Sequence, residues 1–189
     1  MKKIIVLVFI ISQIYSNQNN TQSKKLPNFR GFDWNSNIEF VKENEEASYL
    51  QSFSGFGVFA LSYKGKFENY SSRIDYTFKN DSLAECSYTI ECGNFFEDFI
   101  KIRNSIISEL GKPNFWAKTN IKFNNVWVKK NDFGTFYGPE LYWKFEDGFV
   151  GMLSEKSTDG TTITIIYLHQ QTIQDYGVQT VNPYDYIVE

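Results

Sequence analysis

The single histidine of this chain limits the catalytic chemistry available to it. His169 carries the only imidazole, so a His-rich zinc site cannot form, and a serine or cysteine nucleophile would have one candidate base. His169 follows an apolar, strand-like run and precedes two glutamines, a position typical of a solvent-facing residue at the end of a strand. We therefore expect no catalytic residue and no metal site.

Carboxylates are numerous enough to keep a small paired-carboxylate hydrolase as an alternative function. Most of them fall at expected helix caps, helix faces or turns, where a structural role already explains them. No glycine-rich phosphate loop joins a strand to a helix, so no cofactor is expected. The carboxylates concerned are Glu43, Glu45, Glu46, Glu97, Asp98, Glu146 and Asp147.

Cys86 and Cys92 are the two cysteines of the chain, and two thiols in an exported protein suggest a disulfide. Along one strand their separation spans about 20 Å, whereas the α-carbons of bridged cysteines approach within about 7 Å. No turn residue interrupts Ser87 to Glu91. We expect both thiols to be free and buried, because a bridge would need a sharp bend between them.

Arg103 breaks the pattern of the helix in which it lies. It falls near the middle of an apolar arc, where an unpaired charge would cost several kcal/mol. Either its aliphatic stem is buried while the guanidinium reaches water, or the guanidinium meets a carboxylate or an aromatic ring. We interpret Arg103 as a buried structural charge and keep a charge in a functional site as the alternative.

The loop Lys129 to Pro139 is the best candidate for a binding site. It combines glycines and polar residues with the aromatic side chains of Phe133, Phe136 and Tyr137. Large apolar side chains on exposed loops commonly mark contacts. The alternative is that the three rings fold back over the sheet edge as a lid. We predict that they bind a partner protein, with a glycan as the alternative ligand.

The charge and the first residues indicate an exported protein. A net charge of −3 over 189 residues argues against a nucleic-acid partner, which requires phosphate neutralisation. Residues 1–16 combine two lysines, an apolar run and a polar end, as a signal peptide does. That run is too short to span a bilayer, so we expect no membrane span after cleavage and a periplasmic or secreted product. Residues 17–28 are expected to form a flexible linker and residues 170–189 a C-terminal tail, with an added edge strand as the alternative for the latter.

The stretch Asn94 to Leu110 predicts the helix around which the fold is organised. Its apolar residues share one arc of about 160° at helical spacing. Asn94 and Glu97 indicate a capping box, and Gly111 followed by Pro113 indicates the end. The apolar residues are Phe95, Phe96, Phe99, Ile100, Ile102, Ile106, Ile107 and Leu110.

Strands surround this helix on both sides in sequence. A first helix of about ten residues is expected from Ser36, with Glu39 completing its capping box. A strand over Gly55 to Phe67 and a hairpin turning at Asn80-Asp81 follow it, and the organising helix covers the buried face of that hairpin. Further strands over Ile121 to Val128, Leu141 to Phe145, Phe149 to Glu155 and Thr162 to Leu168 follow that helix.

We therefore predict an α+β protein with a mostly antiparallel sheet covered by helices. Its domain spans residues 29–169 as two tandem units, each a helix followed by a meander of three strands. The units cover about residues 29–92 and 93–169, because the residues around Ile74 to Asp81 align with those around Leu141 to Gly148.

This organisation resembles a known family. The helix entry Phe32-x-Trp34-Asn35-Ser36, the start Ser36-x-x-Glu39-x-Val41 and the stop Leu110-Gly111-Lys112-Pro113 are similar to those of the beta-lactamase-inhibitor-protein-like repeats and of the related BamE-like (SmpA/OmlA) envelope domains. The resemblance covers about residues 29–169. It implies a binding or scaffolding module rather than an enzyme. The function expected is a non-enzymatic, protein-binding module, with a structural component of the cell envelope as the alternative.

Overall fold

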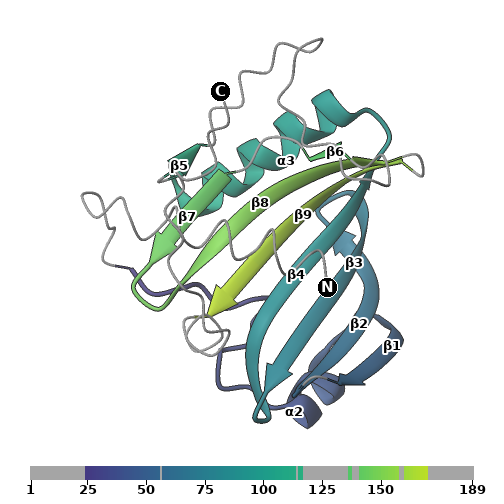
Figure 1. Cartoon of the computed structure of the whole chain (residues 1–189), viewed down its shortest axis with the longest axis vertical. Helices are drawn as coiled ribbons and strands as arrows, with labels where there is room; N and C mark the ends of the chain where they lie inside the picture. Colours follow the sequence, from purple (N-terminus) through teal and green to yellow (C-terminus); the bar gives the residue numbers. More distant parts are fainter. Residues whose placement is uncertain are drawn as a thin grey trace, which may run out of the picture.

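The structure is a computed structural model in which the chain has an α+β fold. Among the residues that the structure describes, one antiparallel sheet is accompanied by two helices, α2 and α3, which lie toward opposite ends of the strands (Figure 1). The α+β class and the antiparallel sheet predicted from the sequence are confirmed. The structure describes residues 24–55, 57–113, 115–116, 136–137, 141–157 and 160–169.

Within these residues the sheet has nine strands in the order β1-β2-β3-β4-β9-β8-β7-β5, and β6 pairs with β8. Seven strands are long, whereas β5 and β6 have two residues each. The elements are α2 Ile38–Asn44, β1 Ser48–Gly55, β2 Val58–Phe67, β3 Tyr70–Lys79, β4 Ser82–Cys92, α3 Phe95–Leu110, β5 Phe115–Trp116, β6 Phe136–Tyr137, β7 Leu141–Phe145, β8 Gly148–Ser157 and β9 Gly160–His169.

The pairing of β4 with β9 joins the two halves of the chain. It is antiparallel and runs without a break from Glu85 opposite Leu168 to Cys92 opposite Thr161. The other long strands pair with their neighbours in sequence, as hairpins do. The strands before α3 therefore form one continuous sheet with those after it.

The first meander has four strands, where the sequence predicted three. The predicted strand Gly55 to Phe67 begins at Val58 as β2, and β1 precedes it. Seven of the eight residues of β1 are exposed. Because it lacks a buried face, β1 also lacks the alternation of apolar and polar residues by which strands are recognised.

The predicted hairpin is confirmed as β3 and β4. Asn80 and Asp81 form its turn with φ angles of 50° and 60°, as a two-residue turn between twisted strands requires. On β3, Ile74, Tyr76 and Phe78 are fully buried, and the residues between them are partly exposed. The buried face of β3 was therefore predicted correctly, whereas on β4 the predicted wet face includes the buried Ser87.

Helix α3 packs on β4 and β9, whereas the sequence placed it over the hairpin of β3 and β4. Its core residues are Phe99, Ile102, Ile106 and Leu110. Ile100 was placed in the same apolar arc but is 47% exposed. The buried arc is therefore narrower than the sequence indicated, because the strands contact one side of the helix and Ile100 lies beyond it.

The helix ends differ in detail from the predicted caps. Asn94 is the N-cap of α3, but Asp98 rather than Glu97 accepts from its backbone N–H, at 2.9 Å. Gly111 ends the helix at a φ of 86°, where a glycine is favoured. The N-cap of α2 is Asn37, not Ser36, and its side chain accepts from the N–H of Phe40.

Replacing Ile106 with alanine tests the packing of α3. Ile106 is 1% exposed, so Ile106→Ala should lower the free energy of unfolding by about 2–5 kcal/mol, through lost burial and the cavity left behind. The matched control Ile100→Ala should change it by less than about 0.5 kcal/mol. Urea denaturation measures both, and equal losses at the two positions would show that the helix face is assigned incorrectly.

Candidate functional sites

The predicted contact residues lie mostly outside the described part of the chain. Phe133 falls in a stretch that the structure does not describe. Phe136 and Tyr137 form β6, whose backbone pairs with Lys156 and Glu155 of β8. Their role as a binding site therefore stays a prediction.

Arg103 is partly buried on α3, and its guanidinium reaches the surface. Its Nε and Nη2 donate to Asn104 Oδ1 at 3.3 and 3.1 Å, in exposed hydrogen bonds. The role of Arg103 therefore stays a prediction.

The two cysteines are separate thiols at different places along β4. Cys86 is buried and faces Tyr167 of β9, whereas Cys92 is partly buried and faces Thr161. Burial raises the pKa of the Cys86 thiol well above its usual value and that of Cys92 to about 11. Since the thiolate is the reactive species, neither residue has the properties of a nucleophile.

His169 lies at the end of β9, as predicted, but it packs against another ring. The imidazole stacks on the indole of Trp34, with centroids 5.6 Å apart and planes 12° from parallel. Burial lowers the pKa of His169, and Asp147 opposes this shift. Trp34 Nε1 and His169 Nδ1 are buried without a hydrogen-bond partner among the described residues. The neutral imidazole of His169 therefore has a packing role.

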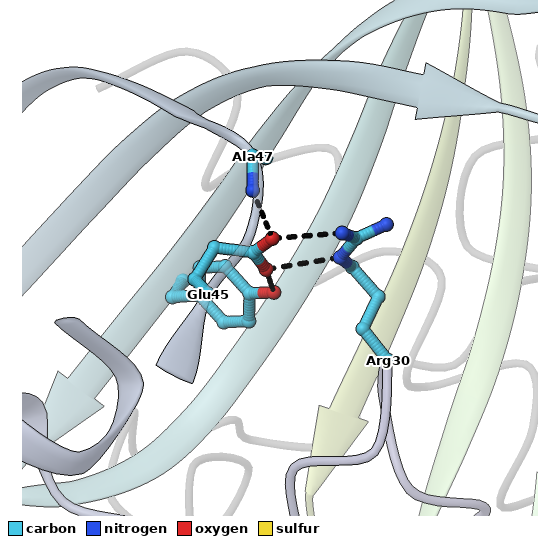
Figure 2. A network of polar contacts seen from close by, with 4 residues as sticks. Arg30, Glu45 and Ala47 are labelled. Atoms are coloured by element: carbon cyan, nitrogen blue, oxygen red, sulfur yellow. Dashed lines mark hydrogen bonds and ion pairs between the residues drawn. The ribbon is translucent and has the colours of Figure 1, made fainter. Parts of the chain in front are cut away.

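A polar network that the sequence did not reveal joins the first described residues to the sheet. We call Arg30, Glu45, Ala47 and Tyr76 the clasp. Figure 2 shows the Glu45 carboxylate accepting from Arg30 and from the N–H of Ala47. The distances are 2.9 Å from Arg30 Nε, 2.7 Å from Arg30 Nη2 and 2.8 Å from Ala47 N, and the Tyr76 hydroxyl also donates to the carboxylate. The Glu45 side chain is 1% exposed.

A tight turn directs the side chain of Arg30 toward Glu45. Phe29 and Phe32 exchange backbone hydrogen bonds of 3.1 and 2.9 Å, and between them Arg30 and Gly31 have φ angles of 53° and 86°. Glycine makes such a turn accessible, whereas arginine must be held in it. The short sequence Phe29-Arg30-Gly31-Phe32 was the available signal for this turn.

Aromatic packing holds the same turn on the sheet. The ring of Phe29 is 2% exposed. It lies 5.5 Å from Tyr76, 4.8 Å from Tyr88 and 5.1 Å from Tyr167, measured between ring centroids. Edge-on contacts of this kind add to the free energy of burial. The turn that carries Arg30 of the clasp is therefore held against the sheet.

The electrostatics of the clasp fix its charges. Burial alone would raise the pKa of the Glu45 carboxyl, but the hydrogen bonds from Arg30 and Tyr76 outweigh burial and hold it below its usual value. The Glu45 carboxylate in turn raises the pKa of Arg30. Burial, followed by the bond to Glu45, raises that of Tyr76. The ionised Glu45 carboxylate accepts from four donors and thereby joins the segments that carry them. It does not have the properties of a catalytic acid or base.

Two further predicted carboxylates have structural partners. Glu97 pairs with Lys101 at 2.6 Å, and Asp147 Oδ1 accepts from the N–H of Leu26 at 2.6 Å. Leu26, in the predicted flexible linker, is 3% exposed. These contacts give Glu97 and Asp147 structural roles.

Asp75 and Glu85 form a second polar cluster, on the face of the sheet away from α3. They are diagonal neighbours on β3 and β4, since Asp75 faces Ser87 and Thr77 faces Glu85. Asp75 accepts from Ser62 Oγ at 2.6 Å and from Arg73 Nε at 2.8 Å. Burial, followed by repulsion from Asp75, raises the pKa of Glu85 to about 7. Two carboxyl groups placed in this way resemble the pair that an acid–base mechanism uses.

The free edge of the sheet at β1 is the third candidate. Tyr49, Leu50 and Phe53 are 57%, 49% and 53% exposed, and among the described residues β1 pairs on one side only, with β2. We call β1 with these three side chains the β1 edge. An edge with unpaired backbone groups and exposed apolar side chains can accept a further strand.

Two other kinds of site receive no support within the described ranges. No group of three or more His, Cys, Asp or Glu side chains there could hold a metal ion. Neither of the helices described is long and apolar enough to cross a membrane.

Removing the charge of Glu45 tests the clasp. Glu45→Gln should lower the free energy of unfolding by about 1.5–3 kcal/mol, because it weakens hydrogen bonds to a charged group in a buried position. The control Glu39→Gln breaks an exposed pair with Lys42 and should cost less than about 1 kcal/mol. In a double-mutant cycle with Arg30→Met, losses that simply add would contradict the pairing.

The raised pKa of Glu85 predicts a pH-dependent stability. The folded state keeps the proton more tightly than the unfolded state, so this contribution is complete below pH 4.5 and is lost as the pH rises through about 7. Glu85→Gln cannot ionise, and its stability relative to the parent should increase across this range and then level off. Urea midpoints at successive pH values measure the difference. The exposed Glu91→Gln on the same strand should show no such trend.

Comparison of the sequence with known protein families, with curated proteins and with solved structures finds no match in any of the three. The sites above therefore rest on the geometry of this chain.

Proposed function

We propose that this chain is an exported, non-enzymatic binding module that holds a partner protein along the β1 edge. The observation that carries the proposal is the exposure of three large apolar side chains on a strand that ends the sheet. Export is inferred from the signal-peptide pattern of residues 1–16. The predicted contact residues Phe133, Phe136 and Tyr137 stay in the proposal as a second contact region.

The β1 edge has few of the features that usually keep edge strands from pairing. Proteins protect such edges with charged side chains, prolines, bulges or very short strands. Residues 48–55 contain no charge and no proline, and the strand is eight residues long. One bulge lies near its start, between Tyr49 and Gln51. The remaining backbone N–H and C=O groups can pair with an extended segment.

Strand addition also explains the pattern of side chains on β1. In this mode the backbone hydrogen bonds give affinity, and alternate side chains give specificity. Tyr49 faces Tyr63 and Phe53 faces Ala60 across β2, so the bulge directs the two aromatic rings to opposite faces. A partner strand would therefore meet an aromatic ring on each face of the sheet.

The clasp supports this edge from the N-terminal side. Glu45 ends α2 and Ala47 immediately precedes β1, and both belong to the clasp. A binding strand held by a buried ion pair changes conformation little on association, so less free energy is lost in ordering it. This rigidity favours binding.

We also infer that the chain consists of two tandem units, α2 with β1–β4 and α3 with β5–β9. The element order and the antiparallel pairing of their last strands, β4 and β9, support this organisation. Two fused units leave β1 as the outer edge of the first unit, where a further strand could extend the sheet.

A pull-down from envelope extract tests the proposed surface. The triple variant Tyr49→Ser, Leu50→Ser, Phe53→Ser should lose at least about ten-fold of the partner retained by the parent, because one apolar anchor alone contributes about 1–3 kcal/mol. These positions are exposed, so folding should be preserved, which circular dichroism checks. The control Phe40→Ser, Ile100→Ser removes two other exposed apolar side chains and should retain the partner. Loss confined to Phe133→Ala, Phe136→Ala, Tyr137→Ala would place the contact at the other region and overturn the assignment to β1.

A further inference from the structure

We propose that the C-terminal residues 170–189 fold back across the sheet and cover a band of side chains on the face away from α3. We call that face the outer face and residues 170–189 the C-terminal strap. This contact is separate from the β1 edge and does not depend on it. The observation that carries it is the burial of apolar side chains on the outer face, where the described residues provide no covering segment.

Three apolar side chains of β8 and β9 are as buried as the core but do not belong to it. Phe149, Ile166 and Leu168 are 2%, 6% and 0% exposed, yet none of them is part of the hydrophobic core cluster. The residues next to them, Val150 and Tyr167, are part of that cluster. Since successive side chains of a strand point to opposite faces, the three lie on the outer face.

The described segments outside the sheet lie on the core side. All the buried apolar residues that they contribute belong to the core cluster. A leucine on an uncovered sheet face would keep part of its surface exposed, whereas Leu168 keeps none. The cover of the outer face therefore comes from outside the described ranges. The core residues that these segments contribute are Leu26, Phe29, Phe32, Trp34, Val41, Phe99, Ile102, Ile106 and Leu110.

The covered side chains form a band that runs across β8, β9 and β4. Gly151 and Ser87 have small side chains and are buried, so they leave room for a segment above them. The next row along the strands, Leu153, Thr164 and Thr89, is only partly buried. A narrow band of this kind fits an extended segment that crosses the strands. Its two rows are Phe149, Leu168 and Glu85, and Gly151, Ile166 and Ser87.

The place where the C-terminal strap begins favours it as the cover. Strand β9 ends at His169, so the strap starts one residue after Leu168, at the first row of the band. Strands are about 4.8 Å apart, and about five extended residues are therefore enough to cross three of them. Large apolar side chains recur along the strap and could fill the band. They are Ile173, Tyr176, Val178, Val181, Tyr184, Tyr186, Ile187 and Val188.

The other long stretches outside the described ranges fit the band less well. Residues 1–16 leave the exported protein with the signal peptide, and residues 17–23 are all polar. Residues 117–135 connect β5 to β6. Through their pairing, these two strands end level with Met152 and Lys156 of β8, so the connection begins and ends away from the row of Phe149. The C-terminal strap is the stretch that starts beside the band.

The carboxyl group of Glu85 lies in the same band. Glu85 faces Leu168 across the β4–β9 pairing, and burial raises the pKa of its carboxyl to about 7. A charge-bearing group on a bare sheet face would be solvated and would not lose its hydration in this way. The C-terminal strap thus also keeps the carboxyl pair of Asp75 and Glu85 from water, and its release would expose the pair.

Photo-cross-linking in the full chain identifies the cover directly. The photoreactive amino acid p-benzoyl-phenylalanine is placed at Thr89, which lies beside the band and is partly buried. After irradiation, mass spectrometry should find peptides from residues 170–189 attached to it. The same amino acid at Ser108, exposed on α3, should not give this product. Attachment from Thr89 to residues 1–23, to residues 117–135 or to a second molecule instead would overturn the proposal.

Cysteine labelling tests the cover without a cross-link. Ser87→Cys places a thiol in the band, and a maleimide should label it at least about ten-fold more slowly than Ser108→Cys, because a covered thiol reacts only after local opening. In chains that end at His169 this difference should disappear. The parent sequence, labelled alongside in both lengths, gives the baseline of the native Cys86 and Cys92. Continued protection of the buried Cys86 shows that the shortened chain is folded.

Two further variants separate the strap from the signal peptide. In the full-length chain, serine in place of the apolar residues of the strap should expose position 87 as the deletion does. A chain without residues 1–16 should keep position 87 covered. The proposal is wrong if position 87 reacts rapidly in the full chain, if it stays covered in a folded chain without residues 170–189, or if loss of residues 1–16 exposes it. If the shortened chain does not fold, the cross-linked peptide decides.

Discussion

The pairing of β4 with β9 is the constraint on which the rest of the structure depends. It connects strands that are far apart in sequence and thereby joins the strands before α3 and those after it into one sheet. Closing such a long loop costs entropy, which the burial of apolar surface must offset. Helix α3 contributes to that burial, because it packs on both strands and its Ile102 and Ile106 are buried in the shared core.

The clasp lies at a different place in the fold and stabilises a buried charge. Glu45 is charged and almost fully buried, which would be unfavourable without partners. Arg30, Tyr76 and the N–H of Ala47 satisfy it, and in doing so they join the first turn, the end of α2 and β3. The start of β1 is thus held in place, although the strand itself buries little. Because the clasp holds the start of β1, this edge strand can be ordered while its side chains stay exposed.

Prediction from the sequence succeeded where burial produces a pattern. The hairpin of β3 and β4 alternates because one of its faces is dry, and α3 shows a helical period because one of its sides packs. It failed for β1, where no face is buried, and at Ile100, where the apolar arc extends past the contact. It also missed Asp75 and Glu85, because acidic residues on an alternating strand look like an ordinary solvated face until the neighbouring strand brings them together.

By itself the sequence determined the α+β class, the position of the long helix with its glycine stop and the main hairpin, since these follow from local propensity and periodicity. Only the tertiary structure decided that β9 joins β4, that Arg30 meets Glu45 and that β1 ends the sheet. Each of these depends on which distant segments become neighbours. Local patterns in the sequence carry no such information, because an apolar pattern indicates that a residue is buried but not which segment packs against it.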